Sequence, residues 1–514
     1  MGPVLLDTHR TRRDALWAGA IVLALTAVYV ANRDFVVGND STGNVSLAVN
    51  LIEEGRVSFT PTGDPAHFRW RLAPPSNRVL EGILSGDTPI GGVPASTLWA
   101  QGRLTPVSGH YYVVRTVRSH PSTGEPVFVN TFGPGAALAA VPVLAVARAF
   151  SGDLRQNPEV TWHAAKVAAS ILVAFSAAFL YLAARVWVSP AVALLVALGY
   201  GLGTCVWSVS SQALWQHPAA EFFLSLGALF LVRATGDRRR PWLAAGLAFS
   251  CAAACRPPDV VFALSVLGWL AWTRSRALVA FLAGCAPPVA ALAAYNTWFF
   301  GRPWSFGQTG AGAGVAIYKT GSPDLWQTPI LTGLAGTLLS PSRGLLVYSP
   351  VLALGLAGAV LAWRSERFAS LRPLALGGVL LIVLESKWFD WWGGWTYGYR
   401  RLVDLAPVLA LLSVPALGWV LAARWRAVVA SAMLAGSVGV QAVGAFAYAP
   451  QGWNARPGRD GEPLDIDQPR HRHRLWSWSD SQIPYQIEHF MAERRERGRL
   501  VRAWIDAWRP PPRR

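Results

Sequence analysis

The chain has 514 residues, of which 52% are hydrophobic and only 15% are charged, and its formal net charge is +17. Apolar runs of about 17 to 25 residues, enough to cross a bilayer as a helix, recur along the sequence, so we predict an all-α, polytopic membrane protein. The positive charge does not indicate nucleic-acid binding, because the arginines lie in short clusters between apolar runs, as the positive-inside rule requires, and form no basic face.

The apolar runs predict about eleven membrane-spanning helices. We place them at residues 14–32, 161–183, 190–208, 218–234, 241–255, 258–273, 277–298, 344–363, 371–387, 403–422 and 427–448. No small-residue cleavage site follows the first run, which we therefore interpret as an uncleaved span and not a removed signal peptide.

The arginine clusters orient these helices. If the N-terminal cluster at residues 10–13 is cytoplasmic, every short arginine-bearing turn between later spans is cytoplasmic too, which satisfies the positive-inside rule. The segment 132–150 is apolar enough to span, but it contains Pro134 and Pro142 and would invert the later turns. We therefore predict that this segment is an interfacial or re-entrant helix.

The longer extracytoplasmic segments of this topology are residues 33–160, 299–343, 388–402 and 449–514. We divide the chain into a transmembrane domain over residues 1–448 and a basic tail over residues 449–514, and we expect interfacial helices in the large first segment. The positive-inside rule depends mainly on charges near the ends of spans, and the charges of this tail begin well beyond the last span. A basic tail on the outer side is therefore compatible with the rule. A helix on the headgroup surface is predicted near the end of the tail, from about residue 482.

Several chemistries are disfavoured by the sequence. The four cysteines fall inside apolar runs without histidine partners, so we expect no metal site and no cofactor. The chain shows no internal repeat and no matching pair of broken helices, and its polar residues gather in the outer segments. These features argue against a secondary transporter.

Asp40 is the leading candidate for a catalytic carboxylate. It lies in the run Gly38-Asn39-Asp40-Ser41, which opens the first outer segment ahead of an amphipathic helix that ends at Gly55. From position alone, Asp40 or Ser41 could equally be the N-cap of that helix. Four other carboxylates in the same segment are fallback candidates, namely Asp34, Asp64, Asp87 and Asp153.

A series of motifs follows Asp40 in a consistent order over most of the chain. They are Phe132-Gly133-Pro134-Gly135, Leu214-Trp215-Gln216-His217, Arg256-Pro257-Pro258, Leu339-Ser340-Pro341-Ser342-Arg343-Gly344-Leu345 with Tyr348-Ser349-Pro350, and Trp391-Trp392-Gly393-Gly394-Trp395-Thr396-Tyr397-Gly398-Tyr399-Arg400. With Asp40 this set resembles the glycosyltransferase C superfamily, in particular the branch of protein mannosyltransferases and the lipid A aminoarabinose transferase. The predicted topology places all of these motifs on the outer side of the membrane, where they can converge on one cavity.

The resemblance implies transfer of a sugar from a polyprenyl-phosphate donor by an inverting, single displacement with Asp40 as general base. Such a reaction needs one carboxylate and a few cations for the departing phosphate. Arg256 is the strongest candidate for a phosphate ligand, since it precedes two prolines at the outer end of a span, although it could be a snorkelling interfacial anchor. Arg343 and Arg400, which end the second and third outer segments, are the next candidates.

Four further residues are predicted to contact substrate. Gln216 and His217 stand at an outer span boundary, where a histidine at the start of a helix can also be purely structural. Trp395 and Tyr397 are flanked by glycines that permit tight turns close to a ligand, so they suggest a platform for a sugar or a lipid. Most of the other tryptophans are expected to form the aromatic belt at the headgroups.

The sequence therefore predicts a hexosyl- or pentosyltransferase in the inner membrane of a bacterium, with a cytoplasmic N-terminus and an extracytoplasmic active site and C-terminus. The expected partners are a polyprenyl-phosphate sugar, membrane lipids and an acceptor that is a glycan, a lipid or a protein. The alternatives are a transporter or flippase of a lipid-linked sugar, which would need no base, and a polymerase or ligase of surface polysaccharide.

Overall fold

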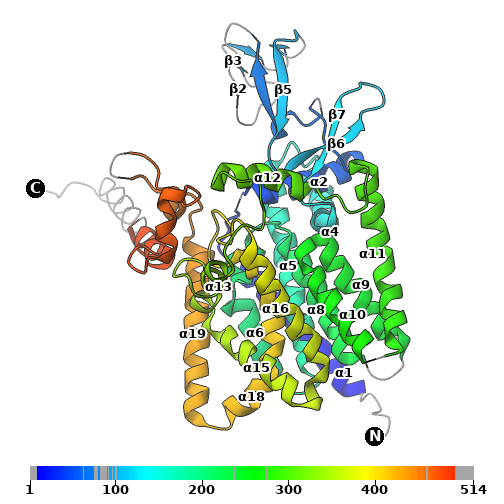
Figure 1. Ribbon diagram of the computed structural model, residues 1–514, viewed down its shortest axis with the longest axis vertical. Coiled ribbons are helices and arrows are strands. Elements are labelled where there is room, and N and C mark those ends of the chain that lie inside the picture. The colour runs from blue at the N-terminus through cyan, green and yellow to red at the C-terminus, as the bar shows by residue number, and fades with distance from the viewer. Residues whose placement is uncertain are drawn as a thin grey trace, which may run out of the picture.

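In a computed structural model of the chain, a long bundle of helices carries a small β-rich region at one end (Figure 1). The structure describes residues 8–36, 38–61, 63–73, 79–80, 89–90, 92–94, 97–98, 101–234, 238–273, 275–458 and 461–492.

Within the described residues, five helical segments are long and apolar enough to cross a membrane, and a sixth is added if one bent pair of helices counts as a single span. The five are α1 (Thr8–Val30), α5 (Pro158–Ala184), α11 (Ala277–Phe300), the segment Glu366–Lys387 that contains α16 (Arg372–Lys387), and α19 (Arg424–Ala447). The bent pair joins α6 (Pro190–Gly203) to the segment Cys205–Gln212, which begins with α7 (Cys205–Ser208), at an angle of 43°.

The remaining predicted spans coincide with shorter helices. These are α8 (His217–Arg233), α9 (Arg239–Cys255), α10 (Val260–Trp272), α14 (Leu345–Tyr348) with α15 (Ala353–Arg364), and α17 (Leu405–Leu412) with α18 (Val414–Leu421). The predicted helical, polytopic membrane fold is therefore confirmed.

Small residues let these helices pack closely. A Cβ atom on Gly246 of α9 would lie 2.1 Å from the carbonyl oxygen of Phe281 on α11, and one on Gly358 of α15 would lie 1.8 Å from that of Leu412 on α17. Glycine is therefore required at both crossings, as is common where membrane helices pack through their backbones.

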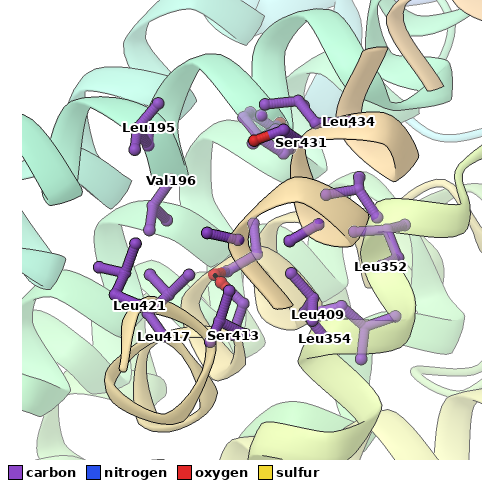
Figure 2. A pocket seen from close by; sticks show the side chains of 17 residues that line it. Leu195, Val196, Leu352, Leu354, Leu409, Ser413, Leu417, Leu421, Ser431 and Leu434 are labelled. Carbon is purple, nitrogen blue, oxygen red and sulfur yellow. Dashed lines mark hydrogen bonds between the residues drawn. The ribbon is translucent and has the colours of Figure 1, made fainter. Parts of the chain in front are cut away.

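A small apolar cavity of about 140 Å³ lies between α6, α17 and α19 (Figure 2). Its lining includes Leu195, Leu409 and Leu434 and carries no acidic or basic side chain. This cavity can accommodate apolar groups, but it offers no residue for acid–base chemistry.

The two ends of the bundle differ. The N-terminus lies at one end, whereas the β-rich region lies at the other, and the segment that follows α19 is attached near that second end (Figure 1). The first outer segment and the C-terminal segment thus share one end of the bundle, opposite the N-terminus, which is the relative placement that the arginine clusters predict.

The first outer segment contains strands in addition to the expected helices. An antiparallel sheet has the order β2 (Val79–Leu80), β1 (Phe68–Leu72), β5 (Leu104–Gly109), and two hairpins pair β3 (Pro89–Ile90) with β4 (Val93–Pro94) and β6 (Val113–Ser119) with β7 (Pro126–Asn130). The helices of this segment were predicted from the sequence, but its strands were not. The residues of β1 alternate between buried Phe68 and Trp70 and exposed arginines, a period of two that favours a strand.

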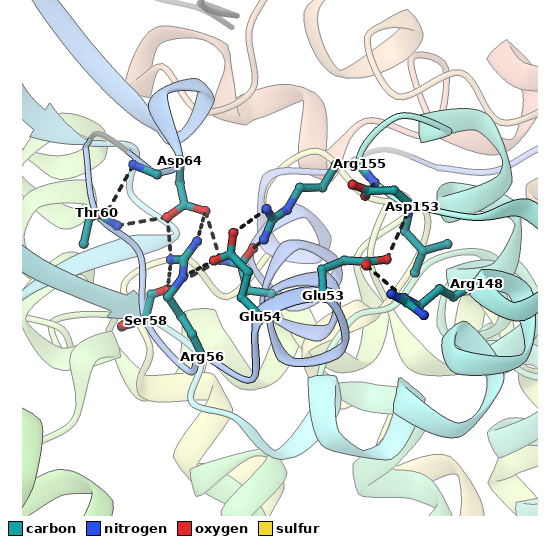
Figure 3. A network of polar contacts seen from close by, with 12 residues as sticks. Glu53, Glu54, Arg56, Ser58, Thr60, Asp64, Arg148, Asp153 and Arg155 are labelled. Atoms are coloured by element: carbon teal, nitrogen blue, oxygen red, sulfur yellow. Dashed lines mark hydrogen bonds and ion pairs between the residues drawn. The ribbon is translucent and has the colours of Figure 1, made fainter.

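Beneath the strands, α2 (Asn39–Glu54) and α4 (Gly135–Ser151) pack against each other, and α4 also packs against α5. The predicted amphipathic helix ending at Gly55 is confirmed, and α4 occupies the segment expected to be an interfacial or re-entrant helix. An ion-pair network joins the end of α2 to α4 and to the following loop (Figure 3). In it, Glu53 pairs with Arg148 at 2.9 Å and accepts a hydrogen bond from the backbone of Leu154.

The C-terminal segment folds against the third outer segment. Trp453 of α20 (Gly452–Ala455), Ile466 and Leu475 form a buried cluster with Trp391 and Trp392. Arg474 of this basic segment is buried and contacts Asp480 and two backbone carbonyls. The described part of the tail is therefore docked on the membrane domain.

The other short helices of this end are α12 (Gly307–Thr320) and α13 (Ile330–Leu339). Residues 482–492 are helical too, as predicted for the start of the surface helix, while the rest of that predicted helix lies outside the described residues.

Candidate functional site

Asp40 stands in the first turn of α2 and is not its cap. The Ser41 hydroxyl accepts a hydrogen bond from the Gly38 amide at 3.0 Å and donates one to the Gly38 carbonyl at 2.8 Å. Capping is therefore performed by Ser41, and the Asp40 carboxylate is left to pair with Arg400 and to accept a hydrogen bond from the Tyr111 hydroxyl.

The surroundings of Asp40 keep it ionised. Burial alone would raise the pKa of Asp40, but the Arg400 charge and the hydrogen bonds from Tyr111 and Arg400 outweigh it, so that the pKa lies below its ordinary value of 3.8. Burial and the nearby Asp40 charge raise the pKa of the Tyr111 phenol well above 10, so Tyr111 stays a hydrogen-bond donor. Asp40 is thus an anion over the whole physiological pH range.

Asp40, Tyr111 and Arg400 form part of the wall of two cavities. The first, which we call the arginine cavity, has a volume of about 350 Å³ and is lined on its polar side by Asp40, Tyr111, Gln216, His217, Arg256, Arg400 and Arg401. Its other walls are largely apolar and aromatic and include Val260, Leu384, Trp326 and Trp388. Five of the predicted site residues, from four segments far apart in the sequence, therefore share one wall, namely Asp40, Gln216, His217, Arg256 and Arg400.

Arg256 lies in this wall, but carboxylates already surround its guanidinium group. It is 4% exposed and contacts Glu385 at 2.6 Å, Asp404 at 2.8 Å and Asp259 at 3.4 Å. A guanidinium that is compensated by three carboxylates has little charge left for an incoming phosphate. The geometry fits a positioning role for Arg256 within the cavity wall better than the direct phosphate contact that we expected.

The same network fixes His217 and Arg401. The Nδ1 atom of His217 lies 2.8 Å from Asp404, and Arg401 pairs with Glu385 at 2.5 Å. Gln216 donates a hydrogen bond to the carbonyl of Phe132 at 3.0 Å. Side chains from α8, α16 and the third outer segment are thereby held against one another at the cavity wall.

Arg400 and Arg401 are the cations best placed to meet an anion. Only Nη2 of Arg400 contacts Asp40, and the Arg400 guanidinium lies 4.7 Å from the ring centre of Trp215. Arg401 lies 4.8 Å from the ring centre of Trp388, and its buried Nε has no hydrogen-bond partner in the described part of the chain. A buried donor without a partner is costly, and a phosphate oxygen in the cavity could satisfy it.

Arg343 does not belong to this wall, which corrects our expectation of a phosphate ligand. It is 1% exposed and donates five hydrogen bonds to neutral oxygens, those of Ser342, Trp392, Gly394, Asn454 and Gln482. Arginine has five N–H donors, so none remains for a substrate. Because two of its acceptors belong to the C-terminal segment, Arg343 anchors that segment to the membrane domain.

Tyr397 is structural for a similar reason. It is 1% exposed, its hydroxyl donates to the carbonyl of Val440 at 2.8 Å, and its ring packs on Gly444. It lines neither cavity, so the substrate contact predicted for it does not fit the structure. Gly398 beside it serves close packing, because a Cβ atom there would lie 2.7 Å from the sulfur of Cys205.

The second cavity, which we call the aspartate cavity, lies on the other side of Asp40 and has a volume of about 530 Å³. Besides the three polar residues that both cavities share, its polar lining includes Tyr318 and Lys319 of α12, Asp390 and Trp395 of the third outer segment, and Gln451, Asp465 and Asp467 of the C-terminal segment. Trp395 was predicted to contact substrate, and it does face a cavity.

Several residues of the site escaped sequence reasoning. Tyr111 belongs to a Tyr111-Tyr112 pair without any recognisable motif, and Lys319 ends a glycine-rich helix. Of the four fallback carboxylates, Asp34, Asp64 and Asp153 line neither cavity, and Asp87 lies outside the described residues. Asp64 is instead paired with Arg56 at 2.7 Å. No group of three or more potential metal ligands occurs in the described segments.

Comparison with known proteins gives a likeness of fold only. No protein-family model and no curated protein matches the sequence. Among solved structures, the chain is similar to the crystal structure of ArnT from Cupriavidus metallidurans bound to undecaprenyl phosphate, with 14% identity and a TM-score of 0.43 over 84% of this chain and 75% of that one. The apo state of the same ArnT gives 13% identity and a TM-score of 0.42 over the same shares.

Proposed function

We propose that the protein is an inverting membrane glycosyltransferase of the glycosyltransferase C type, with Asp40 as its general base. It transfers a sugar from a polyprenyl-phosphate carrier to an acceptor hydroxyl on the extracytoplasmic side of a bacterial inner membrane. The observation that carries this proposal is the position of Asp40 at the boundary between two cavities, one of which combines free arginine donors with apolar walls.

The arginine cavity suits the donor. Trp326, Trp388 and Val260 provide apolar walls for the start of a prenyl chain, while Arg400 and Arg401 provide charge for its phosphate. Bidentate contacts between arginine and phosphate are strong, and they stabilise the charge that develops as the phosphate leaves. The arginine clusters favour an orientation in which this end of the bundle faces outward.

The test is transfer of labelled sugar by the purified full-length protein in detergent, with a panel of undecaprenyl-phosphate-linked mannose, glucose and arabinose. We expect turnover of at least one donor without any ion gradient, which a transporter would not show. Asp40→Asn should lower turnover by about 10² to 10⁴, the usual contribution of a general base. Asp34→Asn is the matched control, because Asp34 is exposed in the same outer segment and lines neither cavity.

Two results would overturn the proposal. Full activity in Asp40→Asn would remove Asp40 as the base. Turnover of pyrophosphate-linked donors only would indicate a polymerase or ligase of surface polysaccharide instead.

A further inference from the structure

The aspartate cavity and the arginine cavity meet at Asp40, Tyr111 and Arg400, and this limits where an acceptor can bind. In a single displacement the acceptor oxygen attacks the anomeric carbon from the side opposite the departing phosphate, and the base must touch that oxygen. With the phosphate in the arginine cavity, the acceptor occupies the aspartate cavity. Its volume of about 530 Å³ falls within the range usual for small-ligand sites.

The charge of this cavity disfavours anionic acceptors. Four aspartates line it, at positions 40, 390, 465 and 467, against the two cations Lys319 and Arg400. Lys319 is already paired with Asp390 and with Asp467, at 2.9 Å for the latter, and Arg400 is paired with Asp40. A phosphorylated or carboxylated acceptor would therefore meet a net negative wall, because Lys319 is paired and the spare donors of Arg400 are assigned to the donor phosphate in the arginine cavity.

The remaining chemistry of the wall suits hydroxyl groups and sugar rings. Carboxylates only accept hydrogen bonds, so the free oxygens of the cavity match a ligand rich in O–H donors. Besides Tyr111, two large aromatic side chains reach the cavity with exposed area, Trp395 at 38% and Tyr318 at 67%. Their rings offer flat apolar faces that retain a polar edge, which complement the apolar face of a pyranose or furanose.

Trp395 is held in place for such a contact. Its indole N–H donates to Asp465 at 2.9 Å, and the same Asp465 oxygen accepts the Asp467 amide at 2.9 Å. The ring is thus fixed by the C-terminal segment, which Arg343 in turn anchors to the membrane domain. A peptide acceptor fits less well, because its carbonyl groups need donors, whereas the indole N–H and the Lys319 ammonium are already engaged.

We propose that the acceptor is an uncharged glycan, bound in the aspartate cavity with one sugar ring on Trp395. The inference rests on the proposed function and names its acceptor class. The glycan hydroxyl oxygen forms a bond to the anomeric carbon of the donor sugar while its proton passes to the Asp40 carboxylate. The bond between that carbon and the phosphate oxygen breaks with its electron pair, and polyprenyl phosphate leaves as the dianion.

The first experiment measures binding, which does not depend on turnover. Neutral oligomannoside, galactan and arabinan fragments are titrated by calorimetry into the full-length protein in detergent, with a phosphorylated lipid A disaccharide and a serine-rich peptide as competing classes. We expect at least one neutral glycan to bind and the other two classes to bind at least ten-fold more weakly. Preferential binding of the phosphorylated disaccharide or of the peptide would overturn the proposal.

Variants locate the bound glycan. Trp395→Ala should weaken glycan binding ten-fold or more, and Asp465→Asn, which keeps the size of the side chain, should weaken it several-fold. Trp425→Ala is the matched control, because Trp425 is an exposed tryptophan at the start of α19 and does not line the cavity. Unchanged affinity in both cavity variants, with melting temperatures like that of the wild type, would place the glycan elsewhere and refute the site.

The transfer assay separates this inference from the proposed function. With a donor that turns over, the KM for the glycan should rise in Trp395→Ala while the KM for the lipid donor stays the same. If no polyprenyl-phosphate donor is turned over although glycan binds at Trp395, the proposed transferase fails and the glycan site stands. If donors are turned over but sugar reaches only peptide or phosphoglycolipid, the transferase stands and the acceptor class is wrong.

Discussion

Replacement of Arg256 by methionine separates the positioning role described above from direct binding of phosphate. Methionine keeps an unbranched, apolar stem but removes the guanidinium that contacts Glu385 at 2.6 Å and Asp404 at 2.8 Å. The two carboxylates would remain in a wall where they are 1% and 0% exposed. The loss should therefore appear first in the stability of the fold.

The size of the effect follows from the burial of the network. Removal of one partner from a buried ion pair costs about 3 to 5 kcal/mol, because a charge is left without compensation. We expect a value near the lower end, about 3 kcal/mol, since Glu385 keeps Arg401 and Asp404 keeps His217, whereas the more distant Asp259, at 3.4 Å, loses its contact with a cation. In domains of about 150 to 250 residues, Tm falls by about 2 to 4 °C for each kcal/mol of lost unfolding free energy. In this larger chain Tm should fall by somewhat less per kcal/mol, so we expect a decrease of about 5 °C.

The assay is thermal unfolding of the purified protein in one detergent, followed by tryptophan fluorescence. Arg256→Lys should show an intermediate Tm, since lysine keeps the positive charge but lacks the planar, five-donor fork of the guanidinium. Arg276→Met is the matched control, because Arg276 is exposed just before α11 and outside this network, and its Tm should equal that of the wild type.

A different pattern would refute the reasoning. If Arg256→Met melted like the wild type but needed a higher concentration of polyprenyl-phosphate donor for half-maximal rate, the guanidinium would bind phosphate directly. The carboxylates would then contact Arg256 only in the absence of substrate, and the phosphate would replace them when the donor binds.

Three further outcomes are expected. Tyr111→Phe removes a hydrogen bond that helps to lower the pKa of Asp40, so this pKa should rise. The acid limb of the pH–rate profile should then move to higher pH. An unmoved limb would show that the contact between Tyr111 and Asp40 is absent. Arg343→Met should release the C-terminal segment, because it removes five buried hydrogen bonds. Limited proteolysis after residue 448 should then be faster than in the wild type. Equal resistance to the protease would contradict the anchoring role of Arg343. Gly358→Ala should destabilise the protein by about 1 to 3 kcal/mol, since the added Cβ would meet the Leu412 carbonyl at 1.8 Å, and an unchanged Tm would show that α15 can shift freely.

The helical part of the fold was predictable from the sequence because apolar length and arginine placement are local signals. Each predicted span coincides with a helix, and α2 ends at Gly55 as its composition indicated. The strands of the first outer segment were missed since β1 and β6 are short and arginine-rich, and a period of two over five to seven residues is a weak signal beside long apolar runs.

The wall of the arginine cavity was partly predictable, since four motifs of the ordered set supply it. The partners of each side chain were not. Arg256, Arg343 and Arg400 look alike in sequence, each beside a glycine, a proline or an aromatic residue near a span boundary. Their different roles depend on which side chains and carbonyl groups, distant in the sequence, contact them in the fold. Arg256 contacts several carboxylates, Arg343 contacts neutral oxygens, and Arg400 contacts a single carboxylate.

The ion pair between Asp40 and Arg400 joins residues that are 360 positions apart. Because a chain is synthesised and inserted from its N-terminus, Asp40 emerges long before the segment that carries its partner. Helices α5 to α16 must be in place before the pair can form, so the earliest polar residue of the site is among the last to be completed. A ribosome-released fragment that lacks the final third of the chain would retain an unpaired Asp40, so formation of the pair requires that insertion has proceeded at least through α16 and the segment that follows it.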